Sequence, residues 1–233
     1  MLYGTFYMKK NAAFFDLFFT LTSPSFSLER NENDVLGLTI QEWETFAESQ
    51  SLYCERAVGK IKDGYTIIER IVEKSGLHAS PAQIREILQL REARMKSALT
   101  NIESEVLNTL SALKVKGIRL CLISNADVID KAWWENSPLF PLFDDAVFSC
   151  DVGFVKPQRE IYEIALKRMD TNAQSSFFVG DGGSGEIKAA KAIGMFTVLS
   201  DHFLKRKNDQ LDTLLQHTDF HAKTFSDILR LFF

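Results

Sequence analysis

The chain has 233 residues, of which 45% are hydrophobic and 25% charged, as expected of a soluble globular protein with one large domain or one domain carrying an insertion. Its formal net charge of −4 gives no chain-wide basic field, so we expect neither nucleic acid nor an anionic membrane as a partner. Without a bilayer-length apolar run, a signal-peptide pattern or metal-type cysteine spacing, the chain is expected in a reducing cytoplasm.

The first expected element is a buried strand over Ala12–Asp16, an apolar run that ends in a single carboxylate. The residues before it, Met1–Tyr7, are expected to be a poorly specified leader, native or artificial, before Met8. An aspartate at the tip of a buried strand is costly unless that tip does chemistry. Thr20 follows four residues later, and Phe18 stands where a second acid would be expected.

The next stretch, residues 23–102, is predicted to be helical and contains no convincing strand. A capping side chain marks each of three helix starts: Thr39 with Glu42 three residues later, Asp63 before a helix over Tyr65–Ser75, and Ser80-Pro81 before a helix through Leu99. An insertion directly after the first strand lies at the carboxyl end of the sheet, where open α/β proteins bind ligands. There it can act as a lid.

The rest of the chain alternates helices with short apolar runs. The expected strands are Arg119–Ser124, Ala146–Cys150, Phe177–Gly180 and Phe196–Ser200, and the expected helices include Glu103–Lys116, Gln158–Met169, Gly185–Ile193 and an amphipathic Thr224–Phe233. Continuous apolar strands separated by helices predict a parallel sheet buried on both faces. The predicted fold class is therefore α/β, a Rossmann-like doubly wound core over residues 8–22 and 103–233 with a helical cap over 23–102.

Four segments with polar side chains fall at the ends of these strands. They are Asp16, Ser124-Asn125, Lys156 in the loop after the third strand, and the glycine-rich loop from Asp181 to Glu186. Because the carboxyl ends of parallel strands meet at one edge of a sheet, we expect these side chains to share a site.

Together these segments resemble the haloacid dehalogenase (HAD) superfamily, whose members are mostly phosphatases. The family's first motif is commonly Asp-x-Asp-x-Thr, and its other motifs are a hydrophobic strand ending in Ser or Thr, a Lys often followed by Pro, and a Gly-Asp pair followed by a further acid. Their counterparts here are Asp16-Leu17-Phe18-Phe19-Thr20, Leu122-Ile123-Ser124-Asn125, Lys156-Pro157, and Gly180-Asp181 through Glu186. The resemblance covers Met8 to about Phe225, and the insertion looks like the family's helical cap.

The resemblance implies a Mg²⁺-dependent phosphatase that acts on a small phosphorylated metabolite. Asp16 would be nucleophile and metal ligand, forming an aspartyl-phosphate intermediate. The implied further metal ligands are the backbone carbonyl of Phe18, Asp181, and Glu186 through a water molecule. The implied phosphoryl-binding groups are the Ser124 hydroxyl, the backbone amide of Asn125 and the Lys156 ammonium, while Thr20 would order the nucleophile loop.

Phe18 departs from the family pattern, because phosphatases carry there an Asp that protonates the leaving alkoxide and then activates water. Losing a general acid or base costs about 10²–10⁴-fold in rate. Acyl and aryl phosphates would suffer less than alkyl phosphates, since good leaving groups need little protonation. Two alternatives stay open: carbon–halogen hydrolysis as in haloacid dehalogenases, which also lack the second Asp, and a turnover-deficient protein that binds a phosphorylated ligand or a partner.

The remaining polar and aromatic signals are given mostly structural interpretations. Lys205, Arg206 and Lys207 are expected to be a solvated helix start. Solvated faces are also favoured for Arg56, Lys60, Arg91 and Arg94, although Arg56 or Lys60 could reach an anionic part of a substrate. Trp133-Trp134 is expected to serve packing or self-association, in a monomer or homodimer. Cys121 and Cys150 are expected to be buried reduced thiols.

Overall fold

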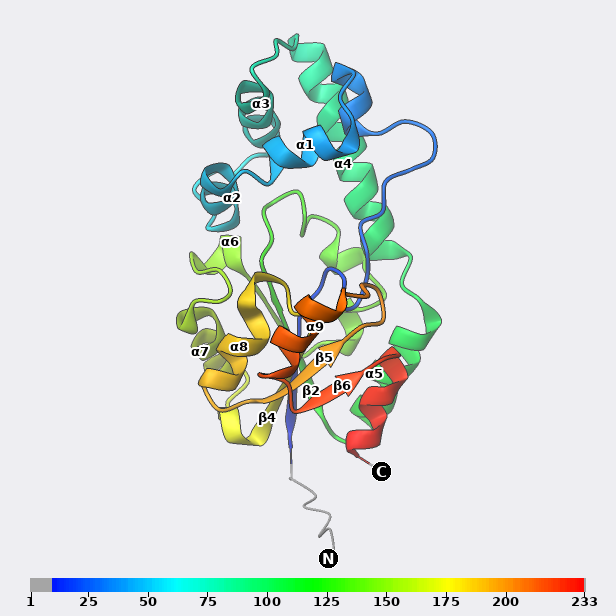
Figure 1. The fold of residues 1–233 in the computed structure, drawn as a ribbon, viewed down its shortest axis with the longest axis vertical. Coiled ribbons are helices and arrows are strands. Elements are labelled where there is room, and N and C mark those ends of the chain that lie inside the picture. The colour runs from blue at the N-terminus through cyan, green and yellow to red at the C-terminus, as the bar shows by residue number, and fades with distance from the viewer. Residues whose placement is uncertain (1–9, 233) are drawn as a thin grey trace, which may run out of the picture.

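A six-stranded sheet of parallel strands, in the order β3-β2-β1-β4-β5-β6, carries the strand ends singled out by the sequence (Figure 1). The computed structural model describes residues 10–232, so the expected leader Met1–Tyr7 lies outside the described residues. The strands are β1 (Ala12–Phe15), β2 (Arg119–Ser124), β3 (Asp145–Phe148), β4 (Ser176–Gly180), β5 (Phe196–Ser200) and β6 (Phe220–Ala222). The five predicted strands are confirmed with small shifts at their ends. The sequence analysis missed β6, whose three residues include a histidine and give no apolar run.

Both faces of the sheet are buried, as the continuous apolar runs predicted. Alternate residues of β1 point to opposite faces: Phe15 packs in one cluster with α5 (Ser104–Val115), and Phe14 in another with α7 (Arg159–Arg168) and α8 (Glu186–Ala192). The other helical elements of this part of the chain are α6 (Ser149–Val152), α9 (Asn208–Leu215), η2 (Trp134–Asn136), η3 (Phe140–Leu142), η4 (Ala173–Ser175), η5 (Gly183–Gly185) and η6 (Phe225–Leu231). The expected C-terminal helix is thus the 3₁₀ segment η6, which still buries Phe225 against the sheet.

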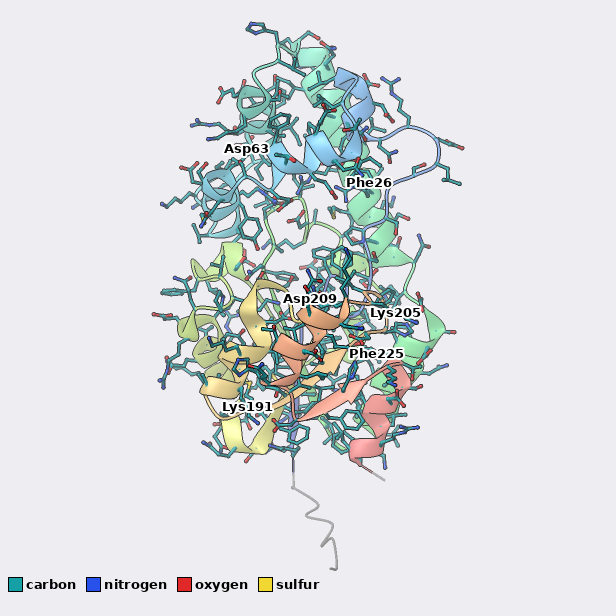
Figure 2. The ribbon with its side chains drawn as sticks, in the orientation of Figure 1. Phe26, Asp63, Lys191, Lys205, Asp209 and Phe225 are labelled. Atoms are coloured by element: carbon teal, nitrogen blue, oxygen red, sulfur yellow. The ribbon has the colours of Figure 1, made fainter. Side chains whose placement is uncertain are left out.

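The helical insertion consists of η1 (Glu32–Leu36), α1 (Ile40–Ala47), α2 (Gln50–Ala57), α3 (Gly64–Ser75) and α4 (Pro81–Thr100). It lies beyond the carboxyl ends of the strands (Figure 1), and Figure 2 shows Asp63 among its side chains. The predicted caps form, since the Thr39 hydroxyl accepts from the Glu42 N–H and the Asp63 carboxylate from the Thr66 N–H. The insertion has an apolar core of its own around Ile67, Ile68 and Ile87.

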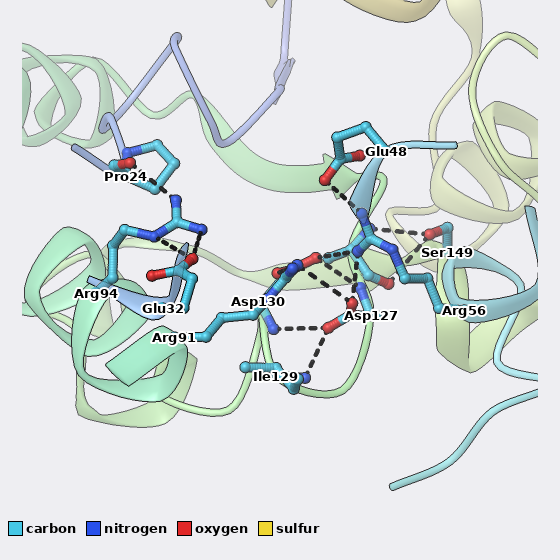
Figure 3. Close-up of polar contacts among 11 residues, drawn as sticks. Pro24, Glu32, Glu48, Arg56, Arg91, Arg94, Asp127, Ile129, Asp130 and Ser149 are labelled. Atoms are coloured by element: carbon cyan, nitrogen blue, oxygen red, sulfur yellow. Dashed lines mark hydrogen bonds and ion pairs between the residues drawn. The ribbon is translucent and has the colours of Figure 1, made fainter. Parts of the chain in front are cut away.

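A buried ion-pair network joins the insertion to the core (Figure 3). The Arg56 guanidinium donates to Asp127 Oδ2 at 2.5 Å and to Asp130 Oδ2 at 3.3 Å. Arg91 Nη2 donates to Asp130 Oδ1 at 3.0 Å, and Glu48 accepts from Arg56 Nη2 at 2.6 Å. The solvated-face interpretation is wrong for Arg56 and Arg91, each of which is only 2% exposed. A single sequence shows the helix that carries an arginine but not the carboxylates it will meet.

Arg94 lies close to this network and is also paired rather than solvated. Its Nε and Nη2 donate to Glu32 Oε1 at 3.0 and 2.5 Å, and its Nη1 donates to the Pro24 carbonyl oxygen (Figure 3). The packing interpretation of Trp134 is confirmed, because its ring makes edge contacts with Phe143 and Phe148.

Within residues 10–232, no helix combines the length and the apolar character needed to cross a membrane. The three cysteines are free, and Cys121 is buried as predicted, whereas Cys150 is half-buried and Cys54 exposed.

Candidate active site

Asp16 sits immediately after β1, in a tight turn that holds its carboxylate in place. The Leu17 carbonyl accepts hydrogen bonds from the Leu21 and Thr22 N–H groups at 2.8 and 3.2 Å, which closes the turn. Thr20 Oγ1 donates to Asp16 Oδ2 at 2.9 Å. Asp16 is 6% exposed, so its carboxylate is largely shielded from water, and the bond from Thr20 orients one of its oxygens.

Lys156 lies between two carboxylates from different elements. Its ammonium donates to Asp16 Oδ1 and, at 2.6 Å, to Glu186 Oε2. Burial lowers the pKa of Lys156, but the carboxylates of Asp16 and Glu186 outweigh that effect and raise it well above its usual value. Lys156 therefore stays cationic over the whole physiological pH range.

Asn125 fixes the backbone that presents this lysine. Its Oδ1 accepts from the Lys156 N–H at 2.7 Å, and its Nδ2 donates to the Lys156 carbonyl at 3.0 Å. For Asn125 the resemblance implied only a role of the backbone amide. The two side-chain bonds join the end of β2 to the loop that carries Lys156.

Asp16, Asp181 and Glu186 bring three carboxylates together, with ligand atoms all within 4.8 Å of one another. Burial and the Asp16 carboxylate raise the pKa values of Asp181 and Glu186. A divalent cation at this point would relieve the repulsion and offer the oxygen coordination that Mg²⁺ prefers. The donor set and the charge balance therefore fit a magnesium ion.

Arg206, which the sequence analysis placed in a solvated cluster, contacts Asp181. Its Nε donates to the Asp181 carbonyl at 2.9 Å and its Nη2 to Asp181 Oδ2 at 2.5 Å. The neighbouring Lys205, labelled in Figure 2, and Lys207 are exposed as predicted. The solvated-cluster prediction is wrong for Arg206, because the loop after β5 turns this one side chain toward the acidic loop after β4.

Ser124 ends β2 with a buried hydroxyl that has no hydrogen-bond partner within residues 10–232. An unpaired buried hydroxyl is costly. A phosphoryl oxygen would give it a partner, and the phosphate-binding role that the resemblance implied for Ser124 stays a prediction.

Phe18 occupies the position of the missing acid and packs on both sides. Its ring lies against the apolar cluster of the core and against that of the insertion. The residue therefore has a structural role at the junction of the two parts, and it brings no proton donor to the site.

A cavity of about 360 Å³ opens above these side chains, between the sheet edge and the insertion. Its floor includes Asp16, Lys156, Asp181 and Glu186, and its upper wall includes Trp43, Tyr53 and Met95 of the insertion. A substrate bound to the floor would therefore contact the insertion with its other end.

Comparison with known proteins identifies a protein family that matches this chain. A sequence model of the haloacid dehalogenase-like hydrolases matches residues 10–194. A glyceraldehyde 3-phosphate phosphatase of Methanocaldococcus jannaschii is 36% identical over 107 residues, which cover 45% of this chain and 46% of that protein. The matched part thus spans about half the length of this curated relative.

Solved structures share the fold. A HAD family enzyme of Bacteroides thetaiotaomicron, in complex with magnesium and inorganic phosphate, superposes with a TM-score of 0.64 at 19% identity over 86% of this chain and 98% of its own. A dehalogenase superposes with a TM-score of 0.66 at 16% identity over 95% of this chain and 96% of its own. At these identities the likeness concerns the fold alone.

Proposed function

The chain belongs to the haloacid dehalogenase-like hydrolases, and on this premise we propose that it is a Mg²⁺-dependent phosphatase that acts on a small phosphorylated metabolite through an aspartyl-phosphate intermediate. The observation that carries the proposal is the position of Lys156 between Asp16 and Glu186, beside Asp181. This arrangement pairs a nucleophile with a fixed positive charge and an acidic cation site. The phosphatase named among the relatives supports the same reaction class.

Asp16 is the proposed nucleophile. One carboxylate oxygen bonds to phosphorus while the bond from phosphorus to the ester oxygen breaks, and that oxygen leaves with the electron pair. Thr20 holds the other carboxylate oxygen at 2.9 Å, so the attacking oxygen keeps its orientation. Water then attacks phosphorus, which breaks the bond to Asp16 and frees inorganic phosphate.

Three groups are proposed to hold the phosphoryl oxygens. The Lys156 ammonium supplies a positive charge beside Asp16, and Asn125 fixes the backbone that carries it. The Ser124 hydroxyl gains the partner that it lacks. The Asn125 backbone amide is the third donor that we propose.

Mg²⁺ would be held by Asp16, Asp181 and the Phe18 carbonyl, with Glu186 acting through a water molecule. When bound, the cation offsets the repulsion between the carboxylate and the phosphate dianion. Arg206 orients the Asp181 carboxylate from the other side. The bond from Lys156 to Glu186 keeps that acid oriented toward the cluster.

Residues 23–102 are proposed to serve as the cap domain that encloses the substrate, and residues 8–22 and 103–233 as the catalytic core. We further propose, from the composition of the chain, a cytoplasmic enzyme that is a monomer or homodimer. The upper wall of the cavity supports the cap assignment, because it comes from helices of the insertion.

The test is phosphate release from phenyl phosphate by the purified protein with and without Mg²⁺. We expect Mg²⁺-dependent release that Asp16→Asn abolishes and that Asp209→Asn, on the exposed surface of α9 (Figure 2), leaves unchanged. Absence of release from both phenyl phosphate and acetyl phosphate by the metal-loaded protein would contradict the proposal. Metal-independent chloride release from a 2-chloro acid would then favour dehalogenation, and thermal stabilisation by phosphorylated ligands without turnover would favour a binding protein.

Phe18→Asp tests the role of the missing acid. A carboxyl group at this position can protonate an alkoxide, so hydrolysis of glycerol phosphate should rise by about 10²-fold or more. Phe18→Leu keeps an apolar side chain and should show no such gain. An unchanged rate in a folded Phe18→Asp variant would contradict this account.

A further inference from the structure

We infer that the substrate is a phosphate monoester of an aromatic hydroxyl compound that carries no second charge; the inference rests on the proposed phosphatase function and names its substrate class. It draws on four aromatic side chains around the cavity, on the pairing of every arginine in its wall, and on the absence of an acid at Phe18.

Aromatic side chains from both parts of the chain line the cavity. Phe18 and Phe19 come from the turn after β1, next to the proposed nucleophile, and Trp43 and Tyr53 come from α1 and α2. A group that leaves from a phosphate on Asp16 would enter a cavity whose wall includes these four residues, of which Trp43 is almost completely buried. Aromatic rings offer an aromatic partner both apolar area and favourable edge or offset contacts.

Phe19 is the clearest sign that this wall meets a ligand. Its backbone has a φ of 61°, in the left-handed region that phenylalanine rarely adopts, and its side chain is 39% exposed. Neither burial nor backbone preference therefore accounts for a phenylalanine here. Strained residues at a cavity are a recognised indication of function, and an aromatic ligand would cover the exposed ring.

The charges of the cavity wall exclude a second anionic group on the substrate. Arg56 and Arg91 are neutralised by Asp127 and Asp130, at N–O distances from 2.5 to 3.6 Å. Arg94 is paired with Glu32 at 2.5 Å. Glu44 and Glu48 add negative charge to the same wall. Among the described residues of the insertion that line the cavity, no positive charge is left to bind a second phosphate or a carboxylate.

The chemistry of the leaving group leads to the same class. With Phe18 in place of an acid, the oxygen that leaves must depart without a donated proton. A phenol has a pKa of about 10, as the tyrosine side chain shows, whereas an alkanol lies close to water, at about 15.7. A phenolate can therefore leave from this site at a rate that an alkoxide cannot reach.

Inhibition by two phosphonates that cannot be hydrolysed tests the aromatic wall by binding alone. In the presence of Mg²⁺ we expect phenylphosphonate to inhibit more tightly than methylphosphonate, by about 2- to 10-fold for each aromatic contact. Phe19→Gly, which permits the same backbone, and Tyr53→Leu should each lower this ratio at least twofold. Tyr53→Phe retains the ring and should preserve the ratio. Phe140→Ala removes another exposed phenylalanine, 45% exposed and outside this cavity, and should leave the ratio unchanged.

Substrate rates separate a failure of this inference from a failure of the proposed function. We expect phenyl phosphate to be hydrolysed at least tenfold faster than 4-carboxyphenyl phosphate and glycerol phosphate. Mg²⁺-dependent hydrolysis of acetyl phosphate, together with equal inhibition by the two phosphonates, would overturn the aromatic substrate class and leave the phosphatase intact. No phosphate release from either phenyl or acetyl phosphate would overturn the proposed function itself.

Discussion

Replacing Arg56 by methionine should destabilise the protein far more than removing an arginine from its surface. Methionine keeps much of the apolar length of the side chain and removes only the charge and the donors. Asp127, which is fully buried, would lose its 2.5 Å bond, and Arg91 alone would face two carboxylates. The variant therefore leaves an uncompensated negative charge at the junction of the insertion and the core.

The expected cost is about 3–5 kcal/mol, the range measured when one partner of a buried ion pair is removed. For a chain of this size, each kcal/mol shifts the melting temperature by about 2–4 °C, so the shift should be about 6–20 °C. Arg30→Met is the matched control, since Arg30 forms a 2.7 Å ion pair with Glu86 but its side chain is 56% exposed. An exposed pair contributes only about 0–1 kcal/mol.

Urea unfolding of the unmodified protein, Arg56→Met and Arg30→Met, followed by circular dichroism, gives the loss of unfolding free energy for each variant. Urea is uncharged and does not screen the ion pairs. Adding Asp127→Asn to Arg56→Met should recover part of the loss, because the unpaired carboxylate is then neutral. A free energy of unfolding for Arg56→Met within about 1 kcal/mol of that for Arg30→Met would contradict this prediction, because a difference this small is typical of exposed pairs.

Three further predictions concern the acidic cluster and two close backbone approaches. Because the pKa of Glu186 is raised, the folded state without metal keeps this proton to higher pH than the unfolded chain, so the free energy of unfolding in EDTA should fall as pH rises above about 4.5. Glu186→Gln should flatten that slope, and an equal slope in both proteins would contradict it. Gly180→Ala places a Cβ 2.0 Å from Glu186 Oε1 and should weaken Mg²⁺ binding by calorimetry about 10-fold or more, whereas unchanged affinity would argue against the cluster as the metal site. Gly59→Ala places a Cβ 2.1 Å from the Cys150 carbonyl oxygen and should lose more unfolding free energy than Gly117→Ala, which has a similar positive φ but open space around it; equal losses would count against a tight contact between insertion and core.

Much of the fold could be predicted from local patterns. The apolar runs predicted both ends of β2 and of β5 correctly. The caps at Thr39, Asp63 and Ser80 predicted three helix starts of the insertion. These features depend on neighbours within a few residues, which a single sequence displays directly. The three-residue β6 lacks such a pattern and forms only because β5 offers it a partner edge.

For the candidate site, too, local sequence predicts one part and not the other. Patterns along the chain predicted that Asp16, Ser124, Lys156 and Asp181 would lie at one sheet edge, because parallel strands bring their carboxyl ends together. The chain also shows directly that position 18 carries a phenylalanine and no acid.

The packing of separate elements sets the surroundings of these groups. It turned Arg206 onto Asp181, neutralised Arg56 and Arg91 with carboxylates of the core, and left an exposed, strained Phe19 in the cavity wall. The contacts of these three arginines join side chains from separate elements. A long-range pairing of charges depends on how the elements pack, and it leaves no periodic signal in the chain.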